Sequence, residues 1–120
     1  MHISEAELRG IVVNTTEDYY RRGLCDAIVH SIDHEFFNGV IPPPLEKEKS
    51  LKRIFEEQRK NGVWCYSAFV QGLSHALGQE LQLIYASNGG VQVFQPKEKK
   101  TQNVAYIVFG SNHYQVRIWF

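Results

Sequence analysis

The sequence has 120 residues, of which 43% are hydrophobic and 22% charged; this is ordinary usage for a globular domain and excludes a disordered or low-complexity chain. Its 13 basic residues balance its 13 acidic ones, so bulk charge does not favour nucleic acid or an anionic membrane as a partner. The longest apolar run, residues 104–109, is far shorter than the ~20 residues that a membrane-spanning helix needs.

The N-terminus lacks the basic start and apolar stretch of a signal peptide, so we expect a cytoplasmic protein with Cys25 and Cys65 as free thiols. The length predicts one compact domain over residues 1–120, a monomer without a cofactor. Residues 1–21 are expected to form an N-terminal extension. Residues 40–49 combine three prolines with alternating charges and predict an exposed loop.

The first predicted helix covers residues 27–37, where Ile28, Val29, Ile32 and Phe36 fall on one side. We expect this side to be buried.

A second, amphipathic helix is predicted to start after Ser50, which can cap it, and to end near residues 61–62.

The third predicted helix covers residues 66–77, where apolar residues recur at intervals of three and four. Gly78 follows it in the position that a left-handed C-cap prefers.

Beyond Gly78 the period of the apolar residues changes to two, which is typical of strands. Strands are predicted over residues 81–85 and 91–93, joined by a turn at 88–90, and over residues 104–109 and 116–120. Helices followed by hairpin-linked strands indicate an α+β fold with helices packed on a mainly antiparallel sheet of at least four strands.

Two junctions carry residues of catalytic type. Cys25 lies in a glycine-containing loop that leads into the first predicted helix, and His113 follows a tight turn and leads into the apolar residues of the last predicted strand. A thiol at a helix N-terminus, an imidazole on a strand and backbone amides that bind an oxyanion are together the minimum apparatus for acyl transfer. One histidine and one cysteine also occur together by chance, so this pairing alone does not assign an enzyme.

Several motifs occur in an order and spacing that resembles the ovarian-tumour (OTU) family of cysteine deubiquitinases. The motifs are Gly62-Val63-Trp64, Leu73 and Ala76 in the third predicted helix, the strand at 81–85, Val93-Phe94-Gln95-Pro96, and His113-Tyr114 after an apolar strand. The resemblance implies an OTU-like, papain-related cysteine protease fold in which His113 is the catalytic base.

The family's nucleophile motif is Asp-Gly-x-Cys followed by two apolar residues, His or Arg, Ala or Ser, and an aliphatic residue. Residues 28–32 fit the second half of this motif, which places Ala27 at the nucleophile position. Cys25 is the alternative nucleophile, but aligning the motif's cysteine with Cys25 places Asp26 at a position where the motif has an apolar residue. Alanine at position 27 implies either an engineered replacement of a cysteine or a natural pseudoenzyme.

The resemblance also implies roles around the nucleophile. Backbone amides of Leu24, Cys25 and Asp26 would bind the oxyanion, although the family has Asp and Gly where Leu24 and Cys25 stand. Gln115 or Asn112 would orient the imidazole. Substrate contacts would come from Trp64, Asn112 and Tyr114, with packing as the competing role of Trp64.

The function implied is hydrolysis of isopeptide bonds after the C-terminus of ubiquitin or a ubiquitin-like protein, weak or absent in this chain. A viral or bacterial member would act in the host cytoplasm. Two alternatives stay open: a non-catalytic ubiquitin-binding pseudoenzyme, and a small zinc-binding domain that uses Cys25, His30 and His34, because the two histidines are four residues apart on one helix.

Overall fold

A computed structural model describes residues 5–60, 67–110 and 113–118, with only the backbone described for Glu5, Phe109 and 113–118. The chain forms two compact units, residues 1–73 and 74–120. None of the described helices is long and apolar enough to cross a membrane.

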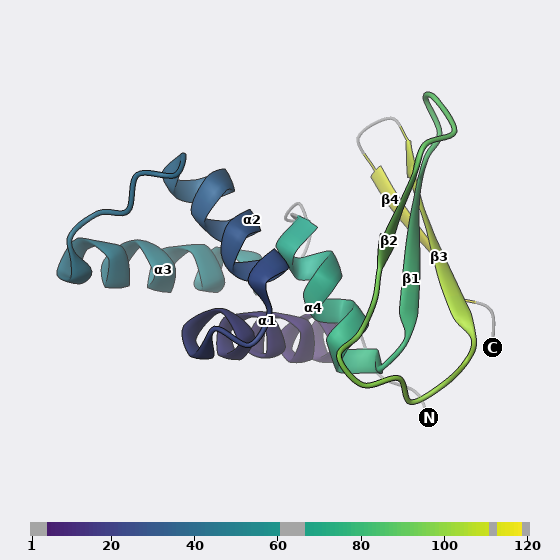
Figure 1. The fold of residues 1–120 in the computed structure, drawn as a ribbon, viewed down its shortest axis with the longest axis horizontal. Coiled ribbons are helices and arrows are strands. Elements are labelled where there is room, and N and C mark those ends of the chain that lie inside the picture. Colours follow the sequence, from purple (N-terminus) through teal and green to yellow (C-terminus); the bar gives the residue numbers. More distant parts are fainter. Residues whose placement is uncertain (1–4, 61–66, 111–112, 119–120) are drawn as a thin grey trace. The chain divides into compact units, whose positions relative to one another are not determined.

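The first unit is helical. It contains α1 (Glu5–Arg22), α2 (Asp26–Phe37), α3 (Pro44–Gln58) and the beginning of α4 (Ser67–Leu77) (Figure 1). Its core consists of buried apolar side chains from all four helices: Val12, Val13, Tyr20, Ile28, Ile32, Leu51, Phe55, Ala68 and Phe69. The predicted burial of the Ile28 and Ile32 side of α2 is confirmed, since neither side chain is exposed.

The prediction of an N-terminal extension over residues 1–21 is corrected by α1. Val13, Thr16 and Tyr20 of this helix are buried in the core of the helical unit. The sequence did not reveal this helix because a threonine occupies one of its most buried positions. Thr16 is accommodated there because its hydroxyl donates a hydrogen bond to the Val12 carbonyl at 2.7 Å.

The exposed segment at residues 40–49 is also only partly a loop. Val40 and Leu45 are highly exposed, but α3 already begins at Pro44, and the predicted cap Ser50 lies within the helix. Proline suits the first position of a helix because the amide that it lacks has no partner within the helix there. The proline run therefore ends at a helix start.

The second unit contains the end of α4 and a four-stranded sheet: β1 (Glu80–Tyr85), β2 (Val91–Phe94), β3 (Val104–Gly110) and β4 (His113–Ile118). The order in the sheet is β2-β1-β3-β4. β2 is antiparallel to β1 and β4 is antiparallel to β3, whereas β1 and β3 are parallel. The α+β class is therefore confirmed, and the sheet is mixed.

The segment between β2 and β3 causes the parallel pairing, because it carries the chain from one side of β1 to the other. This segment is fixed to the end of α4 by two backbone N–H groups. The Lys97 amide donates to His75 Nδ1 at 3.1 Å, and the Lys100 amide donates to the Gly78 carbonyl at 2.7 Å. Gly78 has the positive φ of +61° that the predicted C-cap requires.

One face of the sheet is buried and the other is partly exposed. The buried face carries Leu81, Leu83, Phe94, Ala105 and Ile107. The opposite face includes two valines of β2, which are about half exposed. This alternation agrees with the period of two in the sequence.

Candidate functional site

The amino end of α2 is built by a tight turn after α1. The amides of Gly23 and Leu24 donate to the carbonyls of Tyr20 and Tyr19 at 3.2 and 3.0 Å, which ends α1 and reverses the chain. Cys25 then takes an extended conformation as the N-cap of α2, and its carbonyl accepts the first helical hydrogen bond, from Val29, at 3.1 Å.

The side chains at this end of α2 differ in exposure. Cys25 is a free thiol, half buried against the helical core, and it makes no capping hydrogen bond. Leu24 is also half buried, whereas Asp26 and Ala27 are exposed. The negative charge of Asp26 in the first turn is favourable for the helix dipole. A side chain at position 27 is therefore more accessible than the Cys25 thiol.

The structure brings Leu24, Cys25, Asp26 and Ala27 together at one helix end. The other predicted catalytic residues belong to the second unit, where His113 is the first residue of β4 and pairs with Gly110 of β3. Gln115 and Tyr114 follow on the same strand, opposite Val108 and Phe109. Asn112 and Trp64 lie outside the described residues.

The zinc alternative is corrected by the geometry of α2. The rings of His30 and His34 stack with centroids 6.0 Å apart, and both side chains are exposed. Cys25 is not part of this helix but its extended N-cap residue. Within residues 5–60, 67–110 and 113–118, no three His, Cys, Asp or Glu side chains are placed to hold a metal ion.

A cleft of about 710 Å³ lies beside the turn that leads to Cys25. It lies between the end of α1, the middle of α2 and the beginning of α3, and includes Gly23 and Val29. The sequence did not indicate this cleft, because its lining comes from three helices and the loop before α3.

A tyrosine–aspartate pair and two further charged contacts link the helices that line the cleft. Tyr20 donates its hydroxyl to Asp33 Oδ1 at 2.6 Å, and Lys47 Nζ lies 5.3 Å from the centre of the Tyr20 ring. Arg21 binds both carboxylate oxygens of Glu48 at 2.9 Å. Burial raises the pKa of the Tyr20 phenol above its ordinary value, and the hydrogen bond to Asp33 raises it further. The phenol is therefore a hydrogen-bond donor at neutral pH.

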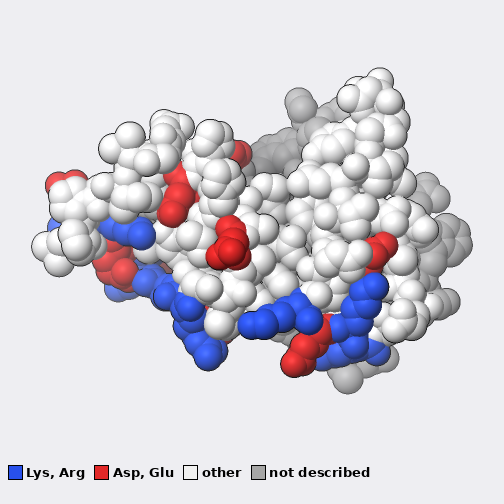
Figure 2. All heavy atoms as spheres, in the orientation of Figure 1, with Lys and Arg blue, Asp and Glu red and all other residues white. Residues whose placement is uncertain are grey.

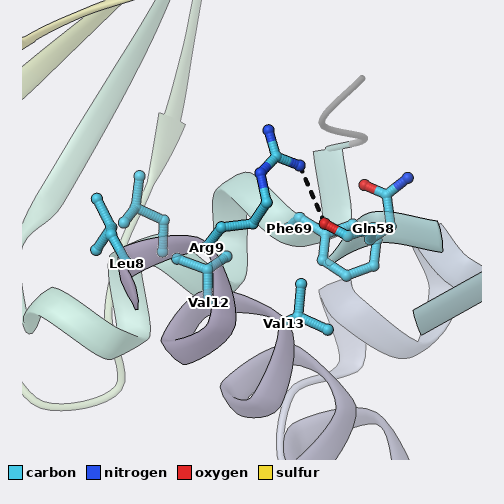
Figure 3. A pocket seen from close by; sticks show the side chains of 7 residues that line it. Leu8, Arg9, Val12, Val13, Gln58 and Phe69 are labelled. Atoms are coloured by element: carbon cyan, nitrogen blue, oxygen red, sulfur yellow. Dashed lines mark hydrogen bonds between the residues drawn. The ribbon is translucent and has the colours of Figure 1, made fainter. Parts of the chain in front are cut away.

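Figure 3 shows a smaller and almost wholly apolar pocket of about 160 Å³ in the same unit. Arg9 extends over it and donates to the Gln58 carbonyl at 3.0 Å. The lining residues are Leu8, Arg9, Val12, Val13, Gln58, Phe69 and Leu73. Among these described lining residues, Arg9 is the only charged one.

No family model matches the chain, and a search of the curated proteins found no match. Its function is therefore inferred from the motifs and from the positions of their residues in the fold.

Proposed function

We propose that the chain is an OTU-like cysteine peptidase domain that recognises the C-terminus of ubiquitin or of a ubiquitin-like protein. The observation that supports this most is the place of the two predicted catalytic positions. Residues 25–27 form the amino end of a helix with a buried face, and His113 opens a strand next to β3. Each is a local junction of the kind at which this chemistry can place its nucleophile and its base.

The proposed reaction is acyl transfer through a thiol at position 27. His113 takes the proton of this thiol, and the thiolate attacks the carbonyl carbon of the scissile bond. Amides at positions 24–27 stabilise the oxyanion, and His113 returns the proton to the leaving lysine amine. Water then releases the acyl group from the sulfur. Gln115 or Asn112 orients the imidazole during these steps.

The chain as written has alanine at position 27 and therefore binds its substrate but cuts it poorly or not at all. The exposure of Ala27 supports this assignment of the nucleophile position, because a thiol there is reachable by a large substrate. Cys25 is the alternative, but its side chain packs partly against the helical core. In the alternative, non-catalytic role, the chain would bind ubiquitin through the same surface but would not carry out acyl transfer.

The test is an Ala27→Cys variant treated with ubiquitin that carries an electrophile at its C-terminus. We expect a covalent adduct that forms with Ala27→Cys and is lost when His113→Ala is added. Ala6→Cys is the matched control, because Ala6 is also an exposed alanine on a helix of the first unit. Gel mobility and peptide mass spectrometry measure the adduct and its position.

Other outcomes distinguish the alternatives. An adduct with the unmodified chain that is lost on Cys25→Ser assigns the nucleophile to Cys25. Ubiquitin binding without an adduct in any variant supports the non-catalytic role. The absence of both ubiquitin binding and an adduct would contradict the proposed function. Equal labelling of Ala6→Cys and Ala27→Cys would contradict it too.

A further inference from the structure

β2 lies at an edge of the sheet, and apart from its short length of four residues it has few of the features that protect an edge strand (Figure 1). Natural edge strands carry charges, prolines or bulges that prevent pairing with another chain. Residues 91–94 contain none of these, and residues 86–96 include no charged side chain. The hairpin end of the sheet is accordingly uncharged on the face that Figure 2 shows.

The register with β1 shows which backbone groups of β2 face outward. The Tyr85 amide donates to the Gly90 carbonyl at 2.8 Å, so residues 85 and 90 form a hydrogen-bonded pair. Pairs alternate along an antiparallel ladder, which makes Ile84 with Val91 and Gln82 with Val93 the non-hydrogen-bonded pairs. The N–H and C=O groups of Val91 and Val93 therefore point away from β1.

The side chains of these two residues are also available. Val91 is 55% exposed and Val93 is 49% exposed, and both lie on the same face because they are two residues apart. The Gln92 side chain lies on the opposite face, where its Oε1 accepts a hydrogen bond from the Tyr85 hydroxyl at 3.0 Å. The outer edge of β2 thus combines two free-facing peptide groups with two exposed valines.

We propose that β2 pairs antiparallel with β2 of a second copy of this chain, about a two-fold axis at Gln92. In this register Val91 lies opposite Val93 of the second copy, and Val93 lies opposite its Val91. Because both residues present their peptide groups outward, each pair exchanges two hydrogen bonds. The two four-stranded sheets then form one continuous sheet.

The strand itself favours a second copy over an unrelated extended peptide. The outward groups occur at two positions symmetric about Gln92, so the edge is complementary to itself, as a two-fold interface requires. The valine pairs bury side chains that are exposed in the single chain. Moreover, the chain has a formal net charge of zero at pH 7, so two copies do not repel each other at long range.

Sedimentation velocity of the full chain over a range of concentrations tests the pairing. We expect a concentration-dependent monomer–dimer equilibrium. Val93→Lys should raise the dimer dissociation constant at least ~10-fold, because charges on an edge strand oppose pairing. Val40→Lys is the matched control, since Val40 is a 77% exposed valine outside the sheet, and it should leave the equilibrium unchanged.

A cysteine at the proposed axis gives a test that does not depend on loss of a dimer. The two copies of Gln92 form a non-hydrogen-bonded pair with Cα atoms about 4.5 Å apart, within the range of a disulfide. Gln92→Cys should therefore form a reducible dimer on mild oxidation, with the bridge mapped to position 92 by mass spectrometry. Gln95→Cys, which lies opposite Gly89 in this register, should not.

Three results would overturn the proposal. They are a monomer at all concentrations up to about 1 mM, a dimer that Val93→Lys and Val40→Lys affect equally, and open-ended polymers instead of a closed dimer. Equal cross-linking of Gln92→Cys and Gln95→Cys would also contradict the register. An added peptide that binds β2 without self-association would assign the edge to another partner.

Discussion

Tyr20 is a buried residue whose surroundings change its chemistry. It is only 6% exposed, and its hydroxyl donates to the Asp33 carboxylate. Burial and this hydrogen bond both favour the neutral phenol, so the pKa of Tyr20 lies above its ordinary value in the folded chain. The pair joins α1 to α2 beside the large cleft.

Replacement of Tyr20 by Phe should lower the free energy of unfolding by about 1–3 kcal/mol, because Asp33 loses its donor in a partly buried place. Asp33→Asn should have a smaller effect, since an amide oxygen can still accept the hydrogen bond. Urea unfolding of Tyr20→Phe, Asp33→Ala and the double variant measures the coupling between the two residues, because alanine at position 33 removes the acceptor. Additive effects would show that the hydrogen bond contributes nothing.

The raised pKa of Tyr20 also predicts a loss of stability in alkali. The folded state holds the phenolic proton more tightly than the unfolded state, so this contribution is complete below the unfolded pKa of about 10 and is lost as the pH rises above it. Between pH 8 and 11, the melting temperature of Tyr20→Phe should therefore decline less than that of the parent chain.

The lowered pKa of His75 predicts a loss of stability of the fold at acid pH. Burial, followed by the positive charge of Lys97, lowers the pKa of His75, and its Nδ1 accepts the Lys97 amide only when that nitrogen is unprotonated. The contribution of neutral His75 to the stability of the fold is complete above the unfolded pKa of about 6.5. It is lost as the pH falls through the lower pKa of the folded state.

The variant His75→Asn should reduce this loss of stability between pH 7 and 5, because an amide oxygen accepts the same hydrogen bond and does not titrate. Thermal unfolding across this range is the measurement. The control is His34→Asn, which makes the same substitution at an exposed histidine of α2. Identical profiles for the parent and His75→Asn would refute the role of His75.

At the scale of the elements, Gly72 of α4 faces Thr16 of α1. A methyl group on Gly72 would overlap the Thr16 hydroxyl, which is itself bound to the Val12 carbonyl. Gly72→Ala should therefore destabilise the fold by about 1–3 kcal/mol through overpacking. Gly10→Ala in α1, where no atom lies within 4 Å, should instead be neutral or stabilising.

A second substitution distinguishes overpacking from other causes. Thr16→Ala in the Gly72→Ala background removes the clashing hydroxyl, so the double variant should lose less stability than the two single losses added together. Chemical denaturation gives these values. Strict additivity would mean that the two helices do not meet at this pair.

Elements with a regular apolar period were predictable from the sequence, and elements without one were not. The helix at 26–37 and the hairpin around residues 88–90 repeat at one period throughout, and both were found with nearly correct bounds. α1 has a threonine at a buried position, and α3 starts with a proline, a residue that usually interrupts a helix. The parallel pairing of β1 with β3 is non-local, so no local period indicates it.

For the whole molecule, the same distinction applies to the candidate site. The sequence placed Cys25 and Ala27 at a helix start and His113 at a strand start, because each position is defined by a local junction. It did not indicate the cleft beside Gly23, whose walls come from residues as far apart as Tyr20 and Leu51. It suggested a zinc site with Cys25, His30 and His34 because they are close in the sequence, but Cys25 is the extended N-cap residue and does not share the helical face of the two histidines.

The sheet order β2-β1-β3-β4 has a consequence for biosynthesis. β1 leaves the ribosome before both of the strands that flank it, and its second neighbour is complete only when Gly110 has been added. Until then the nascent chain holds a two-stranded ribbon, which is marginally stable in water by itself. Leu81 and Leu83, which are buried in the folded chain, therefore stay open to chaperones until residues 104–110 have left the ribosome and paired with β1.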